Sequence, residues 1–118
     1  MADDEQLPAR LNRAAALDRL GNHAQIYGQV LDMFRETLPV TCADIVAHMQ
    51  AGQWPEAARK AHSLKGSSGA VGADRLLQLA AAAELALAGG GVDAAVTQSA
   101  VQALLAEAQA LLAELKAA

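Results

Sequence analysis

The residues of this chain that could do chemistry gather in one stretch, between residues 57 and 73. One stripe of small or apolar residues recurs there at helical spacing: Ala57, Ala61, Leu64, Ser68 and Val71. A second stripe is rotated from the first by about 100°, the turn that each residue adds to an α-helix. It holds His62, Lys65, Gly66 and Gly69. If the first stripe faces a helical core, the second lies at the solvent edge, so we expect His62 at the protein surface.

Two glycines on an exposed helical stripe need an explanation in a chain that contains 30 alanines. Glycine destabilises a helix by up to about 1 kcal/mol relative to alanine. Gly66, one turn after His62, and Gly69 beyond it would clear space above the imidazole for a partner's backbone or a transferred group. Alternatively, the glycines only tighten packing against a neighbouring helix or fray a helix end. The spacing alone leaves both interpretations open.

A lysine accompanies the histidine on this face. Lys65 follows His62 by three residues, so both side chains share one patch of helix surface. A neutral imidazole nitrogen is a nucleophile near neutral pH. The ammonium disfavours the imidazolium form and would neutralise a phosphoryl group attached to the ring. The alternative is an ordinary solvated lysine.

Residues 62–68, His-Ser-Leu-Lys-Gly-Ser-Ser, followed by Gly72 and Ala73, closely resemble the signature of histidine-containing phosphotransfer (HPt) domains. The resemblance extends to the Gly-Gln-Trp turn at 52–54, to the leucine-rich helix that follows and to the long final helix. It therefore covers about residues 17–117. Short histidine motifs are weakly specific, but a seven-residue block in a chain of this length and type is strongly specific.

The resemblance implies a four-helix bundle whose exposed His62 is phosphorylated on a ring nitrogen. The phosphoryl group would come from the receiver aspartate of a hybrid sensor histidine kinase, or from a kinase, and pass to a response-regulator receiver. Lys65 matches the family's phosphate-stabilising lysine, and Gly66 matches the glycine that leaves room for the phosphate. The chain would be a phosphohistidine carrier without independent catalytic activity. It would need no cofactor, because Mg²⁺ would bind on the receiver.

In several HPt domains, a Glu or Gln 22 residues after the histidine hydrogen-bonds the unreactive imidazole nitrogen, and here that residue is Glu84. If two helices meet near Gly72, His62 and Glu84 lie at heights within about 3 Å of each other, at 1.5 Å per residue. A carboxylate accepting from Nδ1–H would fix the tautomer and direct Nε2 outward. The alternatives are a solvated position or a salt bridge to Lys65.

We expect a receiver to dock around His62, through transient and largely hydrophobic contact with a charged rim. The expected docking residues, together with parts of segment 22–51, are Ala58, Arg59, Lys65, Gly66 and Gly69. Charge favours the same region: residues 55–75 hold four basic and two acidic residues, a formal +2, whereas the whole chain is −4. A basic patch would complement the acidic pocket of a receiver.

The composition predicts the architecture that must position these residues. Of 118 residues, 53% are hydrophobic and 3% aromatic, and 30 Ala and 17 Leu dominate while β-branched residues are scarce. This excludes a β-sandwich, disfavours a Rossmann-type sheet and predicts an all-α fold. The length suits a single domain over residues 1–118, with residues 1–6 as a flexible tail.

Glycines and prolines divide the chain into five expected helices, at about residues 7–20, 22–51, 54–69, 73–88 and 93–116. Pro8 would stand in a first turn, Asn22 and Asp93 would be N-caps, and Pro39 would bend or break its helix. Short linkers predict an antiparallel up-down four-helix bundle, with the first segment as a short capping helix. The apolar residues expected to face inward include, in the second segment, Ile26, Val30, Met33, Phe34, Leu38, Ile45 and Met49, and in the last, Val96, Ala100, Leu104, Leu111 and Leu115.

Several classes of site and partner are disfavoured. The single Cys42 excludes an internal disulfide or a cysteine-based zinc site, and no histidine has a partner at metal-binding spacing, so we expect no metal. The acidic balance argues against nucleic acid as the main partner. The acidic start is unlike a signal peptide, and no apolar run reaches the ~20 residues of a membrane span. We expect a cytoplasmic monomer without membrane contact, and the Met1 start favours a separate chain over a piece of a hybrid kinase.

Two other functions stay open at this point. The chain could be a helical adaptor that keeps the fold but not the chemistry, or the phosphoacceptor domain of a chemotaxis-type histidine kinase. The source of the phosphoryl group would distinguish the three.

Overall fold

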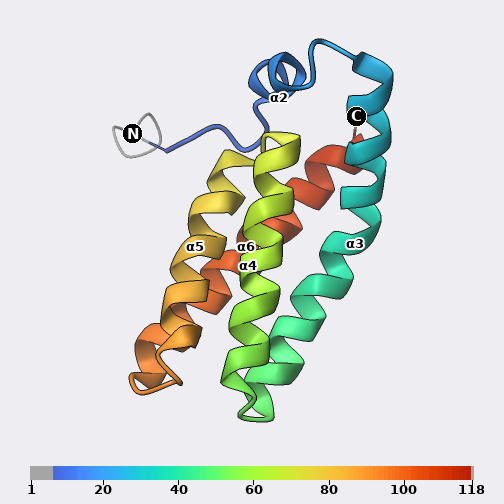
Figure 1. The fold of residues 1–118 in the computed structure, drawn as a ribbon. Coiled ribbons are helices and arrows are strands. Elements are labelled where there is room, and N and C mark those ends of the chain that lie inside the picture. The colour runs from blue at the N-terminus through green and yellow to red at the C-terminus, as the bar shows by residue number, and fades with distance from the viewer. Residues whose placement is uncertain (1–6, 118) are drawn as a thin grey trace.

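The structure, a computed structural model, describes residues 7–117, and this part of the chain is all-helical (Figure 1). It contains five helices and no strand: α2 (Arg13–Arg19), α3 (Ala24–Gln50), α4 (Trp54–Val71), α5 (Asp74–Ala88) and α6 (Ala94–Ala117). The predicted all-α class is confirmed. The expected tail over residues 1–6 lies outside the described residues.

The four longer helices form a bundle around a common core. In Figure 1, α3, α4, α5 and α6 run alternately down and up, and α2 lies across the end at which α4 and α5 are joined. α4 packs between α3 and α5, and α6 packs against α5 and α3. The connections span only residues 51–53, 72–73 and 89–93, and such short links place consecutive helices side by side.

Every helix contributes buried side chains to the core. The large side chains among them are Tyr27, Phe34, Leu38, Ile45, Leu64, Val71, Leu76, Leu87, Val101, Leu104, Leu111 and Leu115. α4 and α5 also bury alanines without any exposed surface, namely Ala57, Ala61, Ala80 and Ala83. Small buried side chains let helix backbones approach closely, and α4 and α5 make the most extensive contact of any helix pair. The helix that carries His62 is therefore held along its length.

The expected first helix over residues 7–20 is wrong in its first half. Only Arg13–Arg19 are helical, and the Asn12 side chain caps them by accepting from Ala15 N at 3.2 Å. Residues 7–12 form an N-terminal strap that crosses the α4–α5 turn. Asn12 N donates to Gly72 O at 2.7 Å, and Arg75 N donates to Ala9 O at 3.2 Å. These long-range backbone hydrogen bonds replace the helical ones that local spacing predicts.

In α3 the structure decides between the bend and the break expected at Pro39, and it corrects the expected N-cap. The helix continues without a break through Pro39, although it is visibly curved in Figure 1. Leu38 and Cys42 are buried on either side of the proline, and packing along the whole helix offsets the roughly 3 kcal/mol that an internal proline costs. Asn22 is not the N-cap: it has a left-handed φ of 63°, and the helix begins after His23 without a side-chain cap.

Three of the expected inward-facing apolar residues lie at the surface instead. Ile26, Met33 and Val96 are all exposed, Met33 by 64%. Each directly precedes a buried residue in the chain (Tyr27, Phe34 and Thr97), which places it about 100° away from the core direction. Their apolar character reflects a second face of the helix rather than the core.

The end of α4 and the start of α6 are set by a glycine and an aspartate. α4 runs two residues beyond its expected end and stops at Gly72, which has a left-handed φ of 84°. A Cβ at Gly72 would also overlap the carbonyl oxygen of Asn12, so only glycine lets the N-terminal strap cross here. Asp93 is the predicted N-cap of α6: its Oδ1 accepts from Val96 N at 3.2 Å.

Candidate functional site

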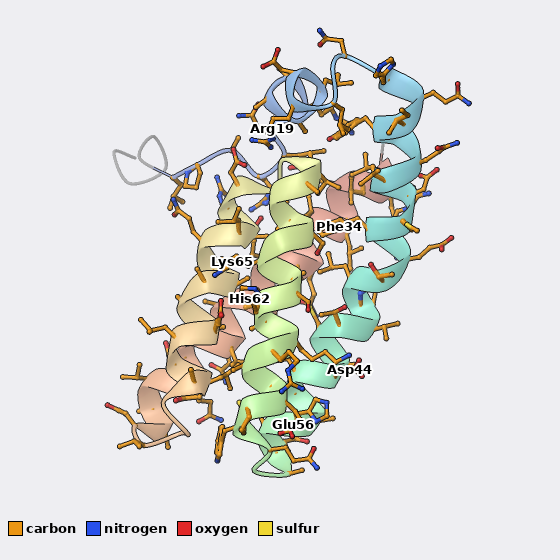
Figure 2. The ribbon with its side chains drawn as sticks, in the orientation of Figure 1. Arg19, Phe34, Asp44, Glu56, His62 and Lys65 are labelled. Atoms are coloured by element: carbon orange, nitrogen blue, oxygen red, sulfur yellow. The ribbon has the colours of Figure 1, made fainter. Side chains whose placement is uncertain are left out.

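His62 lies near the middle of α4 and its side chain is 65% exposed, as the helical phase predicts. On either side of it in the chain, Ala61 and Leu64 are buried and anchor the helix. Figure 2 shows the His62 and Lys65 side chains together on the side of α4 that faces α5. The imidazole therefore stands in solvent on a backbone that is fixed by the core.

A single carboxylate contacts both of these side chains. Glu84, on α5, places Oε2 2.9 Å from His62 Nδ1 and Oε1 2.8 Å from Lys65 Nζ, and its side chain is 26% exposed. The sequence left the hydrogen bond to His62 and the salt bridge to Lys65 as alternatives for Glu84. In the structure the two contacts coexist, one to each oxygen.

The electrostatics of this cluster assign the tautomer of His62. The pKa of Glu84 is lowered, first by the hydrogen bond from Lys65 and further by the one from His62, while partial burial opposes the shift. Glu84 is thus a carboxylate at neutral pH and can only accept hydrogen bonds. In the neutral imidazole the proton is then on Nδ1, which leaves the lone pair on Nε2. An exposed Nε2 with a lone pair is a nucleophile.

The two glycines near His62 differ in their surroundings. A Cβ added to Gly66 would meet nothing within 4 Å, so the space beside His62 is open. At Gly69 the same atom would lie 3.1 Å from Leu77 Cδ1, and the Gly69 carbonyl accepts from Arg19 Nη2 at 2.8 Å. Gly69 thus fits the packing interpretation rather than clearance above the imidazole.

The basic patch expected from residues 55–75 is smaller in the structure. Arg75 turns to the N-terminal strap, where its Nε donates to Pro8 O at 3.2 Å. Lys60 Nζ lies 3.5 Å from Asp44 and Lys65 is paired with Glu84, so two further charges are balanced locally. Arg59 remains an exposed cation on α4. Charge counted along the chain therefore overstates the charge of this surface.

Of the expected docking residues, Arg59 and Gly66 are exposed, while Ala58, Lys65 and Gly69 are half-buried. The sequence placed part of segment 22–51 in the docking surface but turned its apolar residue Met33 inward, and it gave no sign of an apolar surface on the α5 side. On the α3 side a groove of about 190 Å³ is lined by Val30, Met33, Phe34, Thr37, Ser67, Ala70 and Val71. On the α5 side, Leu85 is exposed directly after Glu84. The recurrence of apolar residues every seven positions, at 26, 33 and 40, is the signal that could have revealed the α3 surface.

The rest of the described chain offers no rival centre for chemistry. No group of three or more His, Cys, Asp or Glu side chains in residues 7–117 could hold a metal ion. Cys42 is buried, which raises the pKa of its thiol to about 11 and leaves it inert at neutral pH. None of the helices described is long and apolar enough to span a bilayer.

Comparison with known proteins agrees with the geometry. The family model for the Hpt domain matches residues 29–118. The matched region contains His62, Lys65 and Gly66 on α4 and Glu84 on α5. Searches of curated proteins and of solved structures found no match. Because the family match spans most of the chain and includes the exposed histidine with its carboxylate and lysine, the chain belongs to the Hpt domain family.

Proposed function

We propose that this protein is a phosphorelay intermediate in two-component signalling. His62 accepts a phosphoryl group from the aspartyl phosphate of a receiver domain, such as that of a hybrid sensor kinase, and passes it to a response-regulator receiver. The family match supports the pathway. The observation that carries the role of His62 is its exposed ring, whose Nδ1 lies 2.9 Å from the Glu84 carboxylate, so that Nε2 is free to react.

The transfer step needs no proton to move. The Nε2 lone pair attacks phosphorus, the N–P bond forms as the acyl O–P bond breaks, and the aspartate carboxylate leaves with the electron pair. The ring keeps its Nδ1 proton and becomes cationic, opposite the Glu84 carboxylate. Mg²⁺ and the acidic residues that bind it belong to the receiver, so this chain is a carrier that positions one nitrogen.

The docking surface that we propose combines the surroundings of His62 with the groove on α3. Arg59 and Gly66 lie exposed on α4, and Met33 is an exposed apolar side chain on the neighbouring helix. An exposed apolar patch with a charged rim is typical of a transient protein interface. The monomeric state and the cytoplasmic location are parts of the same proposal.

Incubation with a receiver domain that carries ³²P on its aspartate tests this function. We expect label on the wild type and on a His48→Gln control, and none on His62→Gln. The bound label should be stable in base and labile in acid, as phosphohistidine is. Label that persists on His62→Gln would contradict the assignment of the acceptor.

The same experiment separates the two alternatives. Label that arrives only from an ATP-bound kinase domain would identify the phosphoacceptor domain of a chemotaxis-type kinase. If neither a receiver nor a kinase labels the wild type, the helical adaptor becomes the better description.

A further inference from the structure

We propose that Glu84 does more than orient the ring: it raises the tendency of phosphorylated His62 to give up its phosphoryl group. This inference rests on the proposed phosphorelay function and concerns the energetics of the same site. Its basis is that one carboxylate holds two groups at once, the Nδ1 edge of the imidazole and the Lys65 ammonium. Each of these contacts acts on the phosphoryl group in the same direction.

The first contact concerns the proton on the ring. When Nε2 is phosphorylated and Nδ1 keeps its proton, the ring carries a positive charge. A carboxylate 2.9 Å from Nδ1 favours that charged form. When the N–P bond later breaks, the electron pair returns to Nε2 and neutral imidazole leaves, whereas a ring without the proton would have to leave as an anion. Glu84 therefore keeps the phosphorylated ring in its more reactive form.

The second contact concerns the lysine. Lys65 Nζ is 2.8 Å from Oε1 of Glu84, the carboxylate that also contacts His62 at Nδ1, whereas the phosphoryl group is attached at Nε2. The contact with Glu84 uses one of the three N–H donors of Lys65 and balances its charge, which leaves less of both for the phosphoryl oxygens. The hydrogen bond from Lys65 is also the first cause of the lowered pKa of Glu84, so the two groups are paired before His62 is phosphorylated. Glu84 thus withholds part of the stabilisation that Lys65 would otherwise give to phosphohistidine.

The charged groups near His62 come from two helices. Glu84 approaches from α5, while Arg59 and Lys65 flank His62 on α4, three residues to either side. A role limited to orientation predicts that glutamine would replace Glu84 without effect, because the glutamine amide oxygen accepts the same hydrogen bond from Nδ1. The inferred role predicts that glutamine fails, because it carries no charge.

The test compares the wild type with Glu84→Gln, Lys65→Ala and the double variant, with Asp18→Asn on α2 as a control carboxylate-to-amide change. Phosphoramidate loads the histidine without any partner protein, and ³¹P NMR then follows hydrolysis. Exchange with a phosphorylated receiver gives the equilibrium between phosphohistidine and phosphoaspartate.

For Glu84→Gln we expect a phosphohistidine half-life roughly tenfold longer and an equilibrium shifted toward His62 by a similar factor, the difference between a charged and a neutral hydrogen bond. In ¹⁵N NMR, the phosphorylated ring should lose its Nδ1 proton at lower pH than in the wild type. Adding Lys65→Ala should cancel part of the longer half-life. Asp18→Asn should match the wild type.

A Glu84→Gln protein with the wild-type half-life, equilibrium and Nδ1 protonation would overturn the inference, and so would a shorter half-life. Failure of phosphoramidate to load the wild type would also overturn it, because Nε2 would then not be nucleophilic. If phosphoramidate loads His62 but no receiver exchanges with it, the phosphorelay function fails, and the half-life and protonation still decide the role of Glu84.

Discussion

Two glutamates in this protein each hold two basic side chains, yet their surroundings are opposite. Glu84 stands at the surface between α4 and α5, with Lys65 and His62 as its partners. Glu107 on α6 is only 6% exposed; Arg10 Nε lies 2.7 Å from its Oε2, and Arg75 Nη1 lies 3.9 Å from its Oε1. Both clusters link segments that are distant in sequence.

Burial and the type of basic partner explain why the Glu107 cluster is structural whereas the Glu84 cluster contains a reactive group. A guanidinium stays protonated at any physiological pH, and the hydrogen bond to Glu107 raises the pKa of Arg10 further. The Glu107 cluster therefore has no nucleophilic nitrogen, and its ion pairs only hold the N-terminal strap against α5 and α6. At Glu84 one partner is an imidazole, and in the neutral ring the carboxylate holds the proton on Nδ1 and leaves the lone pair on Nε2.

The clusters also differ in how they relate to the family. His62, Lys65 and Glu84 all lie within residues 29–118, which match the Hpt domain, whereas Arg10 precedes that region. The N-terminal strap and α2 lie before the matched part and are held to it by Arg10 and by the hydrogen bond of Asn12 to Gly72.

Glu107→Gln should have the largest effect of the variants that test this difference, and the effect should be on stability. Two guanidinium groups lose their buried carboxylate, which should lower the free energy of unfolding by about 3 kcal/mol in urea denaturation. Phosphoryl acceptance by His62 should be unchanged in the folded protein. Glu84→Gln is the matched control and should change stability far less. Equal stability losses in the two variants would remove the distinction between the clusters.

The next largest effect is expected at the surface site, for Gly66→Leu. The leucine side chain would fill the open space beside His62, so transfer from a phosphorylated receiver should slow by about 100-fold while the bundle stays folded. Gly66→Ala is the control: its methyl group meets nothing within 4 Å and should stabilise α4 by up to about 1 kcal/mol. Normal transfer kinetics in Gly66→Leu would refute the steric role of Gly66.

The smallest expected effect is on the pH dependence of the stability that Glu84 contributes. Because the pKa of Glu84 is lowered in the folded protein, its contribution to stability is complete above its usual value near 4.5 and is lost as the pH falls through the folded value. The difference in unfolding free energy between the wild type and Glu84→Gln should therefore be small at pH 7, where solvent screens the cluster, and vanish near pH 2. A difference that grows in acid would show that Glu84 is not held as a carboxylate.

The sequence predicts most of the reactive site because the site is built from helical periodicity. The exposure of His62 follows from its phase relative to buried Ala61 and Leu64, at 100° per residue. The approach of Glu84 follows from its distance along the chain to the turn at Gly72, at 1.5 Å per residue. Both quantities are properties of an isolated helix or of one tight turn, so no distant contact is needed to predict them.

Tertiary structure alone decided the other features. The strap at residues 7–12 exchanges a predicted helix for backbone hydrogen bonds to Gly72 and Arg75, sixty or more residues away. The same contacts turn Arg75 from the expected basic patch to Glu107, and the packing of Leu77 decides the role of Gly69. Periodicity could not place Met33 either, because an apolar residue one position before a buried one fits a core stripe equally well. Each of these features depends on contacts with residues that are distant in the chain, and the local sequence of a segment does not specify those contacts.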